Sequence, residues 1–237
     1  MGAGIQQPAV SEGNPFTDVF KVLFEPAEVF ERVRARANFF APFLTIIAVQ
    51  CILFFVNLSY LQVAIQAQMA AQASAQSRPV PGTGMLVAFG LIGLIIVLGL
   101  IFLVGGLLLW VLGSVLGGGE AKFSTMLSVA LYSAVPSGIL LSVVGTIVLH
   151  LQGPGGLTSP QDLQPALGLD LLAPSTKGFM GAVLKGINPF SIWGMVLTAI
   201  GVTTTLRVSK GTGYAIAVTA FVIGLLIAGG FGALSPG

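Results

Sequence analysis

MLVAFGLIGLIIVLGLIFLVGGLLLWVLGSVL, residues 85–116, is an uncharged apolar run that ends at the turn sequence GGGEAK, residues 117–122. A second apolar run occupies residues 123–149. A helix needs about 20 apolar residues to cross the bilayer core, which is about 30 Å thick. The two runs therefore predict a transmembrane hairpin, and its first arm is longer than a membrane requires.

Pro136 lies inside the second arm of this hairpin. Proline lacks an amide hydrogen and crowds the carbonyl group four residues earlier, at Tyr132, so a kink is expected here. Neighbouring helices must supply the missing hydrogen-bond donor, because lipid offers none.

The composition of the whole chain agrees with the hairpin. Of 237 residues, 55% are hydrophobic and 8% are charged. These values predict an all-α, polytopic membrane protein whose partner is the lipid bilayer. A net charge of +2 does not indicate nucleic-acid binding. The single cysteine, Cys51, excludes an intramolecular disulfide and a cysteine-based zinc site.

Three further apolar runs bring the predicted number of spans to five. They occupy residues 40–61, 189–206 and 214–231. We expect two regions: a cytoplasmic amino-terminal segment with short amphipathic, interfacial helices, residues 1–38, and a five-span domain, residues 39–237. A further short helix is expected at 175–187, lying on the opposite membrane surface.

The amino-terminal segment combines an aromatic stripe with basic residues on helices too short and too charged to span. The simpler interpretation is a structural foot beneath the first span. The alternative is a surface that docks on the membrane or recruits a membrane or cytoplasmic protein. The candidate docking residues are Phe16, Phe20, Phe24, Phe30, Arg32, Arg34 and Arg36.

Basic residues are distributed unevenly between the predicted loops. An amino terminus in the cytoplasm places on the inside Lys21, Arg32, Arg34, Arg36, Lys122, Arg207 and Lys210, and on the outside Arg78, Lys177 and Lys185. Cytoplasmic loops carry the excess of lysine and arginine, so we expect this orientation.

Groups that could carry catalysis are almost absent. Ser137 and His150 are the nearest approach to a nucleophile and base, but the serine follows Pro136 and the histidine lies at the membrane edge. No residues suggest a metal or cofactor site, and we expect no enzymatic activity. None of the five predicted spans holds an ionisable group in its interior, which disfavours ion-coupled transport.

Small residues repeat at helix spacing within the spans. Such positions let helices approach closely. Packing within the bundle is favoured over homo-oligomer formation for the fifth span, because four other spans compete for its face. On the fifth span, small residues recur every four positions as far as Gly232. The candidate packing residues of the chain are Gly113, Gly117, Pro136, Ala220, Gly224 and Ala228.

Four segments resemble the Yip-domain family of integral membrane proteins (Ypt-interacting proteins), particularly its bacterial members. They are LFEPAEVF at 23–30, GEAKFS at 119–124, LYSAVP at 131–136 and NPFSIW at 188–193. The resemblance implies five spans, a cytoplasmic amino terminus and, for a bacterial member, a location in the inner membrane. Eukaryotic members are linked to Rab-type GTPases, but this chain lacks their long acidic amino-terminal region, so we do not extend GTPase binding to it.

Two function classes follow. The first is a non-enzymatic protein that organises the membrane or recruits a partner through its cytoplasmic face. The second is a transporter or permease component for a neutral or lipidic substrate. A cavity between the spans would favour the second class, and a solid bundle would favour the first.

Overall fold

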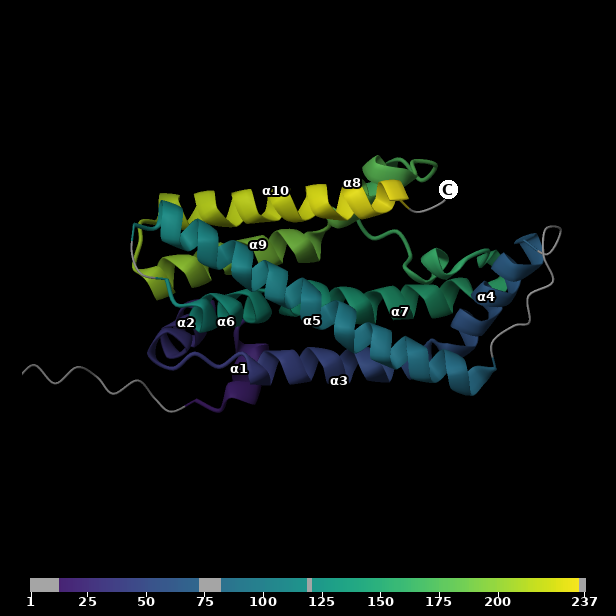
Figure 1. The fold of residues 1–237 in the computed structure, drawn as a ribbon, viewed down its shortest axis with the longest axis horizontal. Coiled ribbons are helices and arrows are strands. Elements are labelled where there is room, and N and C mark those ends of the chain that lie inside the picture. The colour runs from purple at the N-terminus through teal and green to yellow at the C-terminus, as the bar shows by residue number, and fades with distance from the viewer. Residues whose placement is uncertain (1–12, 73–81, 119–120, 235–237) are drawn as a thin grey trace, which may run out of the picture.

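The computed structural model describes residues 13–72, 82–118 and 121–234, and this part of the chain contains helices and no β-strand (Figure 1). The α-helices are α1 (Pro15–Lys21), α2 (Pro26–Ala35), α3 (Phe40–Val56), α4 (Leu58–Gln72), α5 (Thr83–Leu116), α6 (Phe123–Ser133), α7 (Leu141–Gln152), α8 (Gly178–Gly186), α9 (Pro189–Leu206) and α10 (Lys210–Leu234). The predicted all-α, polytopic fold is confirmed.

The number of spans depends on two bent helix pairs. Three straight helices are long and apolar enough to cross a membrane: residues 87–116 of α5, α9, and α10. The pair α3 and α4 bends by 62°, and the pair α6 and α7 bends by 43°. The described residues therefore contain three spans, or up to five if each bent pair is one span.

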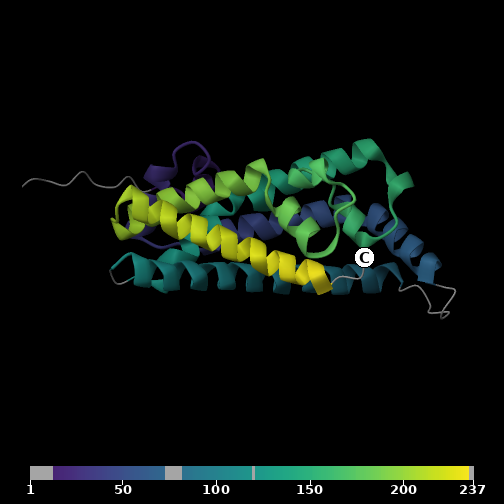
Figure 2. The same ribbon diagram turned by 90° about the horizontal axis from the view of Figure 1, so that it is seen from above.

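The hairpin of α5 and α6 is present, although residues 119–120 of its turn lie outside the described residues. A Cβ atom at Gly106 would lie 2.8 Å from the side chain of Leu127, so glycine lets the two arms meet. The indole Nε1 of Trp110 donates a hydrogen bond to the Ala121 carbonyl oxygen at 2.9 Å. Helix α5 runs obliquely along one side of the bundle (Figures 1 and 2).

The first predicted span, residues 40–61, is broken at Asn57, where the chain bends between α3 and α4. The Asn57 amide nitrogen donates to Thr146 Oγ1 on α7 at 3.0 Å. Beyond the bend, Ala64 of α4 is buried in a small cluster with Leu149 and Leu157. With this bend, the Asn57 side chain is hydrogen-bonded and Ala64 of α4 packs against the loop that follows α7.

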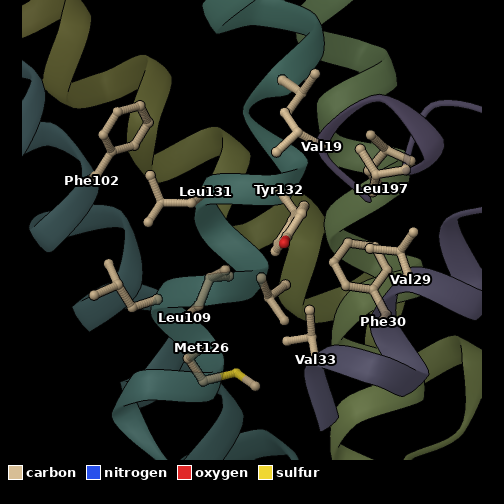
Figure 3. Close-up of a cluster of buried hydrophobic side chains, with 14 of the residues drawn as sticks. Val19, Val29, Phe30, Val33, Phe102, Leu109, Met126, Leu131, Tyr132 and Leu197 are labelled. Atoms are coloured by element: carbon tan, nitrogen blue, oxygen red, sulfur yellow. The ribbon is translucent and has the colours of Figure 1, made fainter. Parts of the chain in front are cut away.

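The main hydrophobic core lies at the end of the bundle that holds α1 and α2. Figure 3 shows Val29, Phe30 and Val33 of α2 facing side chains of α6 and α9, with Tyr132 between them. Gly201 of α9 makes this packing possible, because a Cβ atom there would lie 3.0 Å from the Phe30 ring. Both amino-terminal helices therefore share their core with the spans.

A buried ion pair joins α1 to α2 beside this core. Arg32 donates from Nε and Nη2 to the two carboxylate oxygens of Asp18, at 2.9 and 2.7 Å. Both side chains are at most 10% exposed. The Tyr132 hydroxyl donates to the Pro15 carbonyl at 3.2 Å and ties α1 to α6. Two short helices are thus fixed against the bundle by polar as well as apolar contacts.

Helix α8 falls within the predicted helix at 175–187, but it packs along α10 rather than lying alone on the membrane surface. A Cβ atom at Gly229 would lie 2.6 Å from the Phe179 ring, and one at Gly232 would lie 2.6 Å from the Ala182 side chain. These close approaches place α8 beside the last turns of α10, at the end of the bundle opposite α1 (Figure 1).

Candidate functional site

A cavity of about 750 Å³ lies between the helices, in the half of the bundle away from the main core. Every helix from α3 to α10 except α6 contributes to its wall. Leu53, Phe54, Leu94 and Leu141 form its apolar surface, and polar side chains lie along the rest. Pockets of roughly 300–1,000 Å³ with apolar walls and a few polar groups are typical ligand sites.

The polar wall begins where Pro136 bends the third predicted span. Residues Pro136–Leu140 form a turn of π-helix, which leaves the Gly138 carbonyl available to a neighbour. The Gln50 amide nitrogen of α3 donates to this carbonyl at 2.8 Å and to Ser142 Oγ at 2.7 Å. The expected kink is present. The donor from the neighbouring helix reaches the Gly138 carbonyl rather than the Tyr132 carbonyl, at which it was expected.

Two turns further along α3, a second set of polar contacts continues the wall. Asn57 bonds to Thr146 through its amide nitrogen, and its Oδ1 lies 3.1 Å from His150 Nε2. The imidazole ring also packs against Tyr60, with ring centroids 4.4 Å apart. His150 therefore lies at the end of a polar seam between α3 and α7.

Lys185 of α8 forms the other polar side of the cavity. Its Nζ donates to the Gln164 carbonyl oxygen at 2.6 Å. Burial lowers the pKa of Lys185, while the carboxylates of Asp170 and Asp162 act in the opposite direction and only partly offset it. The Lys185 side chain therefore lies beside the cavity with a lowered pKa.

The loop that carries Gln164 is held in shape by Asp162. The Asp162 carboxylate accepts hydrogen bonds at 2.8 Å from the backbone nitrogens of Thr158 and Ser159 and from the Thr158 hydroxyl. Burial acts to raise the pKa of Asp162, but these hydrogen bonds outweigh it and leave the pKa below its usual value. The loop is therefore an ordered wall of the cavity.

The candidate docking residues divide into two groups. Phe16, Phe20 and Phe24 are exposed, the last at 84%, whereas Phe30 is completely buried. Arg32 is also buried and is paired with Asp18. The expectation that these two residues form part of a docking surface is therefore corrected, because Phe30 lies in the core and Arg32 is held in an ion pair.

The other two arginines of the predicted docking surface remain near solvent. Arg34 pairs with Glu31 at 2.7 Å, three residues earlier on α2, and both side chains are partly exposed. Arg36 follows the last residue of α2 and is exposed. The exposed part of the predicted surface thus consists of three phenylalanines and these two arginines.

The candidate packing residues also differ in their surroundings. Cβ atoms at Gly113 and Gly117 would lie 3.0 and 3.3 Å from the Leu206 side chain of α9. Ala220 packs against the main core, and Ala228 borders the cavity. A Cβ atom at Gly224 would meet no atom within 4 Å, so the close packing expected there is absent. Positions 229 and 232 make the contact with α8 instead.

The described residues contain no group of three or more His, Cys, Asp or Glu side chains that could hold a metal ion. Ser137 Oγ donates to the Ala134 carbonyl at 3.2 Å, while His150 is engaged with Asn57. The serine and the histidine are thus held by different partners.

Sequence reasoning missed Gln50, Asn57 and Lys185 as cavity residues. Gln50 and Asn57 are seven residues apart, which places them two turns apart on one face of a helix. That spacing was a signal, because polar side chains in a span usually face the protein interior. Lys185 comes from a distant segment, and only the fold brings it to the same cavity.

The surface of the bundle identifies its surroundings. Apolar side chains of α5 are more than half exposed, among them Phe89, Ile96 and Leu100. Exposed apolar area of this extent is satisfied by lipid, so the fold defines a polytopic, α-helical integral membrane protein.

Comparison with known proteins gives the family. The Yip1 domain profile matches residues 20–231, and the chain therefore belongs to the Yip1 domain family. It is 29% identical over 209 residues to Membrane protein YknW of Bacillus subtilis (strain 168), covering 86% of this chain and 85% of that protein. No solved structure matches. The expected membership, including a bacterial relative, is confirmed.

Proposed function

We propose that this protein is a non-enzymatic membrane protein that binds a lipidic molecule in the cavity, as a carrier or permease component does. The cavity of about 750 Å³ is the observation that supports this proposal. Its walls combine leucine and phenylalanine side chains with an amide, hydroxyl and ammonium edge, which matches an amphipathic ligand. A solid bundle would have favoured the organising role instead.

Filling the cavity from α10 tests this function. Ala228→Phe is expected to reduce the affinity for lipid about 15- to 60-fold, because the ring displaces two or three methylene groups worth about 0.8 kcal/mol each. Native mass spectrometry of protein released from detergent measures the number of bound lipids. Leu94→Trp fills the same space from α5 and is expected to give the same loss.

Gly224→Phe is the matched control, since position 224 lies one turn before Ala228 and has open space around it. It is expected to retain the wild-type amount of lipid. If both filling variants carry as much lipid as this control, lipid does not occupy the cavity and the proposed function is wrong.

We also propose the inner membrane of a bacterium as the location, with the amino terminus in the cytoplasm. The α5–α6 and α9–α10 connections lie at the same end of the bundle as α1 and α2, and they carry Lys122, Arg207 and Lys210 (Figure 1). This grouping of basic residues supports the orientation. The cavity then lies in the half of the bundle away from the cytoplasm.

Cysteine labelling tests the orientation. On a Cys51→Ser background, Glu25→Cys is expected to react with an impermeant maleimide only after the cells are opened, whereas Ser175→Cys reacts in intact cells. Both positions are exposed. The reverse pattern would establish the opposite orientation, and labelling of both positions in intact cells would require a different number of spans.

A docking role for α1 remains a second prediction. The exposed side chains of Phe16, Phe20 and Phe24 support it, because burying a phenylalanine is worth roughly 1.5–3 kcal/mol. The membrane interface, a protein partner or a second copy of the chain could each supply that contact. Double substitution of Phe16 and Phe20 by serine removes it without touching the main core.

A further inference from the structure

Lys185 is the ionisable residue among those that line the cavity, and no carboxylate lines it within the described residues. The ammonium group donates to the Gln164 carbonyl, which is neutral and leaves its charge in place. None of the ion pairs among the described residues involves Lys185. The cavity is thus bordered by one cation that forms no ion pair with the described residues.

The nearby carboxylates of Asp162 and Asp170 are hydrogen-bonded within the loop that precedes α8. Asp162 is held by Thr158 and Ser159, and Asp170 accepts a hydrogen bond from the Gly168 backbone nitrogen at 2.9 Å. They are close enough to affect Lys185 electrostatically, but neither forms an ion pair with it. Two donors of Nζ therefore remain available to a further acceptor.

The amino-terminal end of α9 lies on the same side of the cavity as Lys185. Asn188, which caps α9, and Ser191 both border the cavity. The Asn188 side chain donates to the Lys185 carbonyl at 3.1 Å, which fixes the end of α8 against the start of α9. The dipole of an 18-residue helix adds partial positive charge at its amino terminus, so this corner favours an anion.

Resting on the proposed function, we infer that the bound lipid is an anionic phospholipid whose phosphate contacts the Lys185 ammonium while its acyl chains lie along Leu53, Phe54 and Leu94. The acyl chains of the lipid pack against this apolar wall, which supplies their contacts with the protein. The phosphate supplies the negative charge that the lysine lacks. A zwitterionic lipid fits the same walls, but its headgroup places a positive charge near the Lys185 ammonium.

The test compares two lipids with identical acyl chains, phosphatidylglycerol and phosphatidylcholine, offered as an equal mixture to the full chain in micelles. Native mass spectrometry measures the ratio of the bound lipids. Wild-type protein is expected to prefer phosphatidylglycerol about fivefold, which is the effect of one basic residue near an anionic headgroup. Lys185→Gln is expected to bind both lipids equally, and Lys185→Arg to keep the preference.

Lys177→Gln is the control, because Lys177 is exposed and does not line the cavity. It is expected to keep the preference. Raising the pH on wild-type protein gives an independent measurement. Burial lowers the pKa of Lys185, so as the pH rises the side chain loses its charge, and the lipid preference is lost, before the pH reaches the usual lysine pKa of about 10.4. Inorganic phosphate in excess should not displace the lipid, since the acyl chains supply most of the contact.

The outcomes separate the two proposals. Equal binding of both lipids by wild-type protein, or an unchanged preference in Lys185→Gln, overturns the role of Lys185 while leaving lipid binding intact. Absence of either lipid from wild-type protein overturns the proposed function itself. Displacement by inorganic phosphate would identify a small anion rather than a phospholipid as the ligand.

Discussion

Replacing Arg32 with methionine is expected to destabilise the bundle by about 3–5 kcal/mol, the usual cost of removing one member of a buried ion pair. Asp18 would lose both charge-assisted hydrogen bonds while remaining buried, at 6% exposure. Hydrogen bonding with Asp18 raises the pKa of Arg32 despite the opposing effect of burial, so the guanidinium group is charged at ordinary pH. Unfolding in detergent, followed by denaturant titration, measures the loss.

Arg34→Met is the matched control for this variant. Arg34 pairs with Glu31 on the same helix, but both side chains are partly exposed, so the expected loss is at most about 1 kcal/mol. The double variant Asp18→Asn with Arg32→Met should recover part of the stability, because no buried charge is left unpaired. Equal losses in the two single arginine variants would show that burial of the Asp18–Arg32 pair is energetically unimportant.

The spans were predictable because their signals are local. The fourth predicted span, residues 189–206, coincides with α9, since Asn188 and Pro189 mark a helix start and Arg207 adopts a left-handed conformation at its end. The hairpin was predictable from two long apolar runs joined by a glycine-rich turn. Neither inference needed knowledge of which helices touch.

Contacts between helices were less predictable, because they depend on the partner. Phe24 and Phe30 both belonged to the predicted aromatic stripe, yet Phe24 is exposed while Phe30 fills the space beside Gly201. Gly224 and Gly229 lie on one helix, and only Gly229 meets another helix, through Phe179. Sequence spacing identifies a face, but the neighbouring helix decides whether that face is covered.

The cavity depended on still longer-range information. Gln50 and Asn57 of α3 find their partners on α7, about 90 residues later, at Ser142 and Thr146. The bend at Asn57 and the π-helical turn that begins at Pro136 lie next to these pairs. Such irregular backbone is tolerated at membrane depth where it is buried in protein or lines a cavity. A pattern of regular spans cannot predict it.

The foot formed by α1 and α2 gives the second large expected effect. Phe30→Ala should reduce the free energy of unfolding by about 3–5 kcal/mol, because it removes a completely buried ring and leaves a hole between α2, α6 and α9. Gly201 has no side chain to fill that space. Thermal unfolding in detergent, with intrinsic tryptophan fluorescence as the signal, measures the change.

Phe24→Ala removes a ring of the same size that is 84% exposed, so it is expected to change stability by no more than about 0.5 kcal/mol. The serine substitutions at Phe16 and Phe20 should likewise preserve most of the stability while removing exposed aromatic area. Negligible loss for both Phe24→Ala and Phe30→Ala would mean that α1 and α2 separate from the bundle in micelles, whereas a large loss for both would mean that Phe24 is packed as well. A loss confined to Phe30→Ala identifies α2 as part of the core and leaves the exposed ring of Phe24 outside it.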